Sequence, residues 1–264
     1  MPKQNGIIKL KGVFNGVSYY KLNGVYVARK AVGPSKERIN SDPAFIKVKA
    51  NNQEFAAASM LSKALRAGLG NNAKYFKDTY MASRLTGCCL KIVQKGSGNL
   101  GQREANIHNN TTALIGFQLN KDLVFNKLIS VKPIVTNNSK RTRVSINIPK
   151  ITAKTHKKLP KNHTHVQLTA ALSVVSNYVW QSDLNTYIPE FPAINALGSA
   201  QQSHKLLCKI EHKNINLNLE SPVNNSIPKQ VAVMVWLGIT YFQKLDNQFI
   251  PQQTAKAMVC VAVV

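Results

Sequence analysis

The chain has 264 residues, of which 44% are hydrophobic and 17% are charged, and this globular composition excludes a wholly disordered protein. Its 35 Lys and Arg residues outnumber its 11 Asp and Glu residues, which gives a formal net charge of +24. Because so large an excess repels itself in the compact state, we expect a polyanionic partner. Nucleic acid is the first choice, and a membrane surface or an acidic protein are the alternatives.

The positive charge is spread along the chain and is not confined to a tail. Residues 1–104 carry a net charge of +13 and residues 105–264 a net charge of +11. The first ten residues contain no apolar signal segment, and the longest apolar runs are shorter than the roughly 20 residues that span a bilayer. We therefore expect a cytoplasmic protein with no transmembrane segment. The four cysteines lack the C-x-x-C spacing, so the sequence predicts neither a zinc site nor a disulfide framework.

Residues 6–30 contain three short runs rich in β-forming residues. Two Asn-Gly dipeptides, at 15–16 and 23–24, separate these runs, and Asn-Gly is the strongest short-range signal for a β-hairpin. Tyrosines and basic residues are interleaved along the segment, and Gly33-Pro34 ends it. The sequence therefore predicts a small three-stranded meander with a basic surface.

A long helix is predicted to begin near Pro43. Ser41 and Asp42 can cap the first N–H groups, and proline suits the first helical position. Gly68 and Gly70 mark its end. Apolar residues recur at gaps of three, four and seven, which indicates one buried helical face: Phe45, Val48, Phe55, Ala58, Leu61, Leu65 and Leu69.

A second helix is predicted from Ala73 to Lys95. Its basic residues are seven, seven and four apart, so they are expected to line one face of the helix: Lys77, Arg84, Lys91 and Lys95. Tyr80 is beside this row, and a basic row with a neighbouring aromatic residue suits contact with phosphates. The alternative is a solvated helix face without a binding role.

From Thr112 onward the pattern changes to short apolar or alternating runs separated by Pro and Asn. Nine runs are expected to be strands; the first spans residues 113–119 and the longest residues 230–242. Several short strands without intervening helices are typical of an antiparallel β-sandwich, here an immunoglobulin-like one. The expected fold class is therefore α+β, with the meander and the helices in residues 1–110 and a β-sandwich domain in residues 111–264.

A second basic surface is predicted between Lys127 and Lys161, a segment with ten basic residues and no acidic one. Its dense points are two short clusters: Lys140, Arg141 and Arg143, and Lys157, Lys158 and Lys161. Segments this basic suit contact with an anion, and the alternative is a set of exposed, solvated loops.

Several segments of the first 120 residues are distinctive: Gly6-Ile-Ile-Lys-Leu-Lys-Gly12, Tyr19-Tyr20-Lys21 with Ala28-Arg29-Lys30, Asp42-Pro43-Ala44-Phe45, and Ser83-Arg84-Leu85 with Gly101-Gln102-Arg103. Together they resemble an uncharacterised protein family, known as hypothetical proteins, that is widespread in Bacteroidota. The resemblance implies a small N-terminal β unit, a helical middle and a β-sandwich-like C-terminal half. It implies no activity and no catalytic residues.

No motif for catalysis or metal binding is prominent. Residues 96–101 match G-x-G-x-x-G, but dinucleotide binding requires a strand before this motif, and a helix is predicted there. His163 and His165 would need a third ligand to hold a metal, and no acidic residue pairs with a neighbouring His or Cys in the sequence. We therefore expect no enzymatic activity, no cofactor and no metal.

The first hypothesis for function is a non-enzymatic basic protein that binds nucleic acid, DNA or RNA, through the phosphate backbone with little sequence readout. The alternative is a self-assembling structural protein of a particle, filament or tube. In that case the positive surface would face an enclosed polyanion or an acidic partner. Edge strands of the N-terminal β unit would then pair with other copies in a homo-oligomer.

Overall fold

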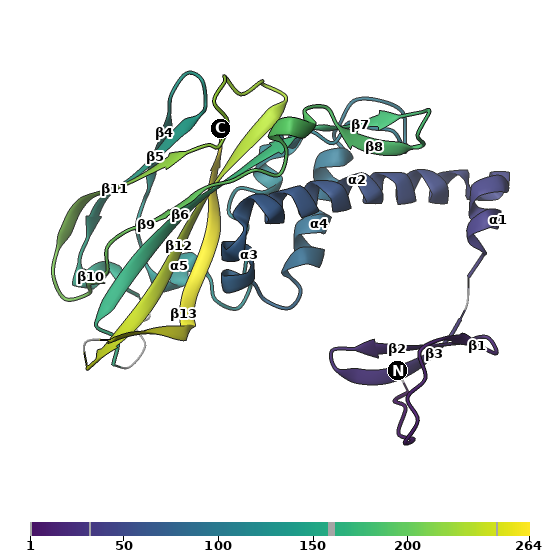
Figure 1. Ribbon diagram of the computed structural model, residues 1–264, viewed down its shortest axis with the longest axis horizontal. Helices are drawn as coiled ribbons and strands as arrows, with labels where there is room; N and C mark the ends of the chain where they lie inside the picture. The colour runs from purple at the N-terminus through teal and green to yellow at the C-terminus, as the bar shows by residue number, and fades with distance from the viewer. Residues whose placement is uncertain (1, 32, 158–161, 247) are drawn as a thin grey trace. The chain divides into compact units, whose positions relative to one another are not determined.

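The computed structural model describes residues 2–31, 33–157, 162–246 and 248–264. They form two compact units that divide between Lys49 and Ala50, and both helices and strands contribute to the fold (Figure 1). This boundary lies in the first turn of helix α2 (Ile46–Leu69) and not near residue 110, where the sequence pattern changes. Most of α2 therefore belongs to the same unit as the C-terminal strands.

The first unit contains a three-stranded antiparallel sheet in the order β1 (Gly12–Phe14), β2 (Val17–Leu22) and β3 (Val25–Lys30). The two Asn-Gly turns have positive φ angles: 51° at Asn15, 74° at Gly16, 48° at Asn23 and 87° at Gly24. Type I′ hairpin turns require positive φ at both central residues, and Asn and Gly adopt it most readily. The predicted meander is confirmed.

Two short helical segments follow, α1 (Lys36–Ser41) and the 3₁₀ turn η1 (Pro43–Phe45). The carboxylate of Asp42 accepts a hydrogen bond from the N–H of Ala44 at 2.9 Å, and Pro43 occupies the first helical position. The predicted cap is confirmed. It starts η1, which leads directly into α2.

A large antiparallel sheet forms the centre of the second unit. Its strands are hydrogen-bonded in the order β10 (Leu206–Leu207), β6 (His165–Ser176), β12 (Val231–Leu245) and β13 (Gln248–Val263), and β9 (Ala200–Gln202) pairs with β6. In the middle of the sheet, Leu237 of β12 pairs with Ala170 of β6 and with Val259 of β13. Leu245 pairs with Gln248, so the predicted hairpin between the last two strands is confirmed.

A second antiparallel sheet covers one face of the large sheet. Its strands have the order β11 (His212–Glu220), β5 (Arg143–Ile151) and β4 (Ile134–Asn137). Val144, Ile146 and Ile148 alternate along β5 and share a core with Val233 and Val235 of β12. The two sheets are seen facing each other in Figure 1.

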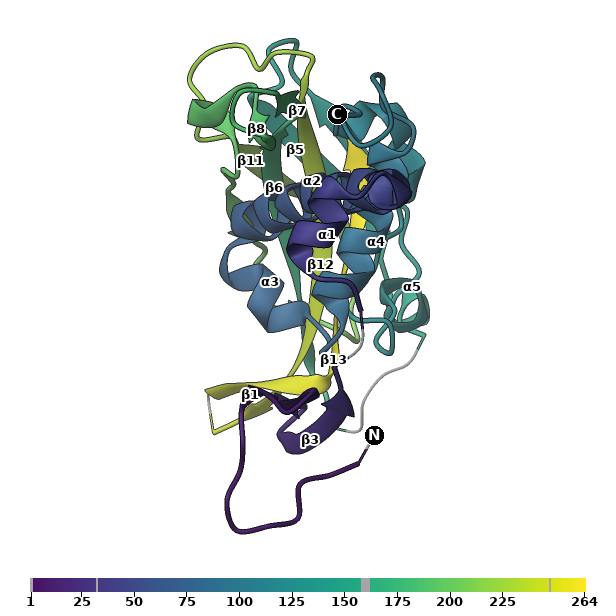
Figure 2. The same ribbon diagram turned by 90° about the vertical axis from the view of Figure 1, so that its right-hand side faces the viewer.

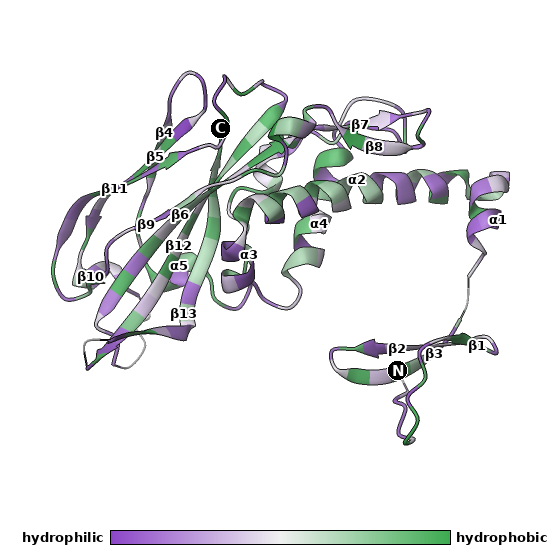
Figure 3. Ribbon diagram, viewed as in Figure 1, coloured by the Kyte–Doolittle hydropathy of each residue, from purple (hydrophilic) through white to green (hydrophobic). Residues whose placement is uncertain are grey.

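Helices cover the other face of the large sheet, as Figure 2 shows. α2, α3 (Asn71–Phe76) and α4 (Met81–Val93) bury Leu61 and Leu85 against Trp236 and Met258 of the sheet. Because both faces are covered, the central strands have nearly continuous apolar runs. Hydrophobic residues dominate the upper halves of β6, β12 and β13 in Figure 3.

Smaller elements connect these layers: the hairpin of β7 (Tyr178–Gln181) and β8 (Thr186–Pro189), η2 (Ile107–Ala113), α5 (Phe125–Leu128), η3 (Ala153–Thr155) and η4 (Pro192–Ile194). The expected strand at residues 113–119 is wrong, since these residues form the end of η2 and a turn. Their N–H groups still bond to the sheet edge. Gly116 donates to the carbonyl oxygen of Cys260 at 2.8 Å, and Leu119 donates to that of Met258 at 2.9 Å.

Two glycines allow α2 to approach the sheet closely. A Cβ added to Gly68 would lie 2.6 Å from the carbonyl oxygen of Leu197, and one added to Gly198 would collide with the carbonyl of Gly68. The hydroxyl of Ser173 on β6 donates to the carbonyl oxygen of Leu65 at 3.0 Å. Gly68 therefore does not end the helix, as the sequence suggested, but provides contact with the sheet within it.

The expected apolar stripe of α2 is wrong in its first half. Phe55 is 53% exposed and Val48 is exposed, whereas Leu61 and Leu65 are fully buried. The buried side of α2 includes Glu54, whose carboxylate is paired with an arginine from another segment. Because a charged residue lies on the buried face there, the spacing of apolar residues predicts the wrong face of the helix as the buried one.

We predict that Leu85→Ala lowers the free energy of unfolding by about 2–5 kcal/mol, because it removes a fully buried side chain from the core under the helices. Phe55→Ala is the matched control, and it should be nearly neutral because its ring is mostly in solvent. Urea denaturation of both variants measures this. A large loss of stability in Phe55→Ala would contradict the burial described.

Candidate anion-binding site

Four basic side chains meet where α2 leads into α3. The chain turns at Gly70, whose φ angle is +55°, a conformation that residues with a side chain rarely adopt. This turn separates two pairs of basic residues, each pair three positions apart. The turn brings both pairs to one hollow: Lys63, Arg66, Lys74 and Lys77.

The hollow has a volume of about 330 Å³. The rest of its lining is small or apolar: Ala67, Gly70, Ala73 and Met81. Lys63, Lys74 and Lys77 are exposed, and Arg66 is half-buried, with its Nε donating to the carbonyl oxygen of Ser62 at 3.2 Å. None of the eight lining residues is acidic.

The charges around this hollow are not neutralised from within the described parts of the chain. The nearest acidic residue in sequence, Asp78, is paired with Arg84 at 2.6 Å. None of the six ion pairs that the described residues form involves one of the four basic side chains of the hollow. Four cationic side chains that line one hollow with no carboxylate in the lining attract a multivalent oxyanion such as phosphate.

The row predicted along one helix is wrong in its geometry. Lys77 is in extended conformation between α3 and α4, and Lys95 lies past the end of α4, so only Arg84 and Lys91 share a helix. Asp78 interrupts the helix, because its carboxylate accepts a hydrogen bond from the backbone N–H two residues later at 2.8 Å. Lys77, Lys91 and Lys95 are nonetheless exposed.

Arg84 is engaged within the protein. Its guanidinium donates to the carboxylate of Asp78 at 2.6 Å and to the carbonyl oxygens of Gln118 and Leu119 at 3.0 and 3.2 Å. Burial alone would raise the pKa of Asp78, but hydrogen bonds from the N–H of Lys121 and from Arg84 outweigh it and hold the pKa below its ordinary value. Arg84 thus ties α4 to the segment that follows η2.

Arg141, in the turn between β4 and β5, is also engaged within the protein. Its guanidinium donates to the carbonyl oxygens of Val264 and Ile227, each at 3.0 Å. Burial lowers the pKa of Arg141 from its ordinary value. This side chain holds Val264 and the segment before β12. Its donors are therefore already used and are not available to a phosphate.

The other residues of the second predicted surface differ in their surroundings. Lys140 is exposed in the same turn, and Lys157 is exposed after η3. Arg143 pairs with Glu220 at 3.0 Å, with both side chains largely in solvent. Two predicted residues lie outside the described part of the chain: Lys158 and Lys161.

The described residues contain no group of three or more His, Cys, Asp and Glu placed to hold a metal ion. Nδ1 of His156 lies 2.7 Å from the hydroxyl of Tyr241. Burial lowers the pKa of His156 to about 4, and the nearby His163 and His212 add to this effect. His156 is therefore a neutral, buried partner of the sheet at neutral pH. Among the described helices, none is long and apolar enough to cross a membrane.

No protein-family model and no curated protein matches the chain. Two solved structures of β-glucuronidase from Parabacteroides merdae, one with glycerol in its active site, are similar over 47% of this chain. Both have 9% sequence identity and a TM-score of 0.22, and the matches cover 12% and 13% of the glucuronidase chains. So slight a likeness, to a small part of a much larger protein, carries no argument about function.

Sequence reasoning found Lys77 but missed its three partners in the hollow. Lys63 and Arg66 have the same spacing as Lys74 and Lys77, and the glycines between the pairs signal a turn. This signal could have been used. Treating residues 73–95 as one helix assigned Lys77 to the face of α4 instead.

We predict that Asp78 contributes stability that is lost in acid. Its pKa is lower in the folded than in the unfolded chain, where Asp titrates near about 3.9. The stabilisation is therefore complete above that value and is lost as the pH falls through the folded pKa. Urea denaturation between pH 6 and pH 3 should show a shallower acid loss of stability for Asp78→Asn than for the wild type. Asp183→Asn, at an exposed position, is the control and should follow the wild type.

Proposed function

We propose that this chain is a non-enzymatic nucleic-acid-binding protein that contacts the phosphate backbone with little sequence readout. The observation that carries the proposal is the hollow of Lys63, Arg66, Lys74 and Lys77, which has four cationic side chains and no acidic one. Phosphate oxygens accept hydrogen bonds from ammonium and guanidinium groups, and such contacts carry affinity without reading bases.

The surroundings of the hollow support this proposal. Tyr75, next to Lys74, is partly exposed, and the ammonium of Lys256 lies over its ring at 3.9 Å from the centroid. Lys91 and Lys95 add exposed charge on the helical layer, and Lys140, Arg143 and Lys157 form a second, weaker contact surface in this proposal. We also propose that the protein is cytoplasmic. We propose that the two facing sheets form an immunoglobulin-like sandwich, and the core that they share supports this description.

We predict that the nuclease-treated protein binds a random DNA duplex with an affinity that falls steeply with salt. Each neutralised phosphate contributes roughly −0.9 to the slope of log affinity against log salt concentration. Replacing Lys63, Lys74 and Lys77 together by Gln should therefore flatten the slope by about 2–3. Fluorescence anisotropy over a range of salt concentrations measures the slope.

The matched control replaces three exposed lysines outside both surfaces, Lys121, Lys209 and Lys229, and removes the same charge. Equal flattening by both triple variants would show that the charge acts diffusely and not through the hollow. No binding of the wild type at low salt would overturn the proposal. Equal affinity for polyglutamate would indicate a general polyanion site.

A separate observation favours a second function, self-assembly. Among the described residues of the first unit, only Val27 has a buried hydrophobic side chain. A three-stranded sheet needs an apolar face packed against another element to be stable. Large apolar side chains are instead exposed: Ile7, Ile8, Leu10, Val13, Phe14, Leu22 and Val25. Residues 2–4 bond to the outer edge of β3, whereas β1 pairs only with β2 among the described strands. The second proposal is that β1 adds to a strand edge of another copy.

We predict, for this second function, that nuclease-treated protein forms oligomers that added salt strengthens, because like-charged copies must overcome their repulsion. Phe14→Asp, at a side chain that is 71% exposed, should shift the protein toward the monomer. Leu184→Asp, at a side chain 64% exposed in the second unit, is the control. Size-exclusion chromatography with light scattering measures both, and a wild type that is monomeric at all salt concentrations would contradict self-assembly.

A further inference from the structure

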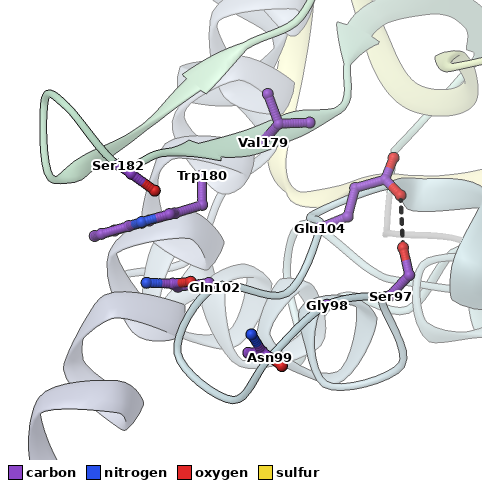
Figure 4. Close-up of a pocket in the computed structure, with 8 residues that line it drawn as sticks. All are labelled: Ser97, Gly98, Asn99, Gln102, Glu104, Val179, Trp180 and Ser182. Atoms are coloured by element: carbon purple, nitrogen blue, oxygen red, sulfur yellow. Dashed lines mark hydrogen bonds between the residues drawn. The ribbon is translucent and has the colours of Figure 1, made fainter.

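A second hollow lies between the loop after α4 and the β7–β8 hairpin (Figure 4). Its volume is about 420 Å³, within the range of small-molecule sites. The residues that line it are Ser97, Gly98, Asn99, Gln102, Glu104, Val179, Trp180 and Ser182. It shares no lining residue with the basic hollow, so it is a separate candidate site.

The loop on one side of this hollow is closed on itself. The N–H of Gln102 donates to the carbonyl oxygen of Asn99, and the N–H of Glu104 to that of Ser97, each at 2.8 Å. Gly98 has a φ angle of +112°, and a Cβ there would come within 3.1 Å of the carbonyl oxygen of Gln102. Backbone bonds and glycine therefore fix the positions of the side chains that face the hollow.

A buried ion pair anchors this loop to α2. Arg103 donates to both carboxylate oxygens of Glu54, each at 2.6 Å, and the N–H of Gly101 donates to one of them at 2.9 Å. Burial alone would raise the pKa of Glu54, but these hydrogen bonds outweigh it and lower the pKa. Neither charge of the pair remains free for a ligand.

The opposite wall is tied to the same loop. Trp180 packs edge to face on Tyr187, with ring centroids 5.2 Å apart. The hydroxyl of Tyr187 lies 3.1 Å from the carbonyl oxygen of Gly101 and 3.0 Å from that of Arg103. The hollow thus has two walls held together by buried contacts before any ligand binds, which lowers the entropic cost of binding.

The polar groups that face the hollow fall into two classes. Glu104 is engaged, since its carboxylate accepts from Asn177 at 2.7 Å, from Asn106 at 3.2 Å and from Ser97 at 3.3 Å. In contrast, four polar side chains have no hydrogen-bond partner in the described part of the chain: Asn99, Gln102, Trp180 and Ser182. In Figure 4 Trp180 and Gln102 lie together, across the hollow from Glu104 and Ser97.

We propose that this hollow binds a neutral sugar ring. Trp180 lines the hollow, and an indole ring can pack on the C–H groups of a pyranose. The free amides and hydroxyl offer both donors and acceptors to the hydroxyl groups of the sugar. In a chain with 35 basic residues, none of the eight lining residues is basic and the one charged group is a carboxylate. A nucleotide would bring a phosphate next to Glu104 without a cation in the lining, so a neutral ligand fits better.

Intrinsic fluorescence offers a direct test on the nuclease-treated full chain. The chain has two tryptophans, and Trp236 is fully buried in the core, so a sugar that covers Trp180 should change the emission of Trp180 alone. The probes are methyl glycosides of glucose, galactose, mannose and N-acetylglucosamine, with cellobiose, lactose and chitobiose. We expect saturable binding of at least one of them.

Two variants test the residues, with affinity measured by calorimetry. Gln102→Ala removes an exposed side chain without internal bonds, so it should keep the fold and weaken binding by roughly tenfold. Trp180→Ala should abolish binding, and Asp183→Ala, in the same hairpin but outside the lining, should leave it unchanged. The proposal is overturned if no probe binds the wild type, if adenosine or adenosine monophosphate binds more tightly than every sugar, or if Gln102→Ala and Trp180→Ala both keep the wild-type affinity.

Discussion

The large sheet of the second unit has two apolar faces, and neither can be left in water. Met234 and Trp236 of β12 belong to the core under the helices, whereas Val233 and Val235 belong to the core shared with the second sheet. At about 25 cal/mol per Å² of apolar surface removed from water, each face must be covered for the sheet to be stable. This requirement fixes the helices on one side and the strands β11, β5 and β4 on the other.

The same requirement shapes the candidate sites. α2 approaches the sheet closely at Gly68, the chain turns two residues later at Gly70, and the basic hollow lies at that turn. The loop after α4 must return to pair with the edge of the core, and Ala105 bonds with Tyr178 of β7 on the way. The hollow beside Trp180 lies at this junction. Both hollows therefore lie beside segments that connect the helical layer to the rest of the unit.

Acidic residues are scarce, and two of the 11 lie where a segment from elsewhere packs on a helix. Glu54 holds Arg103 and Asp78 holds Arg84, each at 2.6 Å. Removing one partner of such a pair leaves a poorly solvated charge, so these carboxylates are difficult to replace. The consequence is that lysines on the outer face of the helices have few carboxylates within reach.

Sequence patterns predicted the local features well, because they depend on neighbours along the chain. The Asn-Gly turns, the cap at Asp42 and the hairpin after Leu245 are set by backbone preferences. The inward role of Arg84 was missed, because it depends on the segment around Leu119, which is distant in sequence. The helix break at Asp78 was missed although its capping hydrogen bond, from the N–H of Tyr80, is local. The partners of Lys77 lie within 14 residues of it, and they were missed because the turn at Gly70 was not used to bring the two basic pairs together.

The hairpin sheet near the N-terminus belongs to a compact unit distinct from the one that carries both hollows, although one chain joins them. A partner that contacts both units binds the second one as an intramolecular event, at an effective concentration set by the connection between them. Two weak contacts, each too slight to persist alone, can then give a long-lived complex. The chain also becomes able to bridge two separate partner molecules when neither offers both surfaces, so the ratio of protein to partner decides between a closed complex and a cross-linked network.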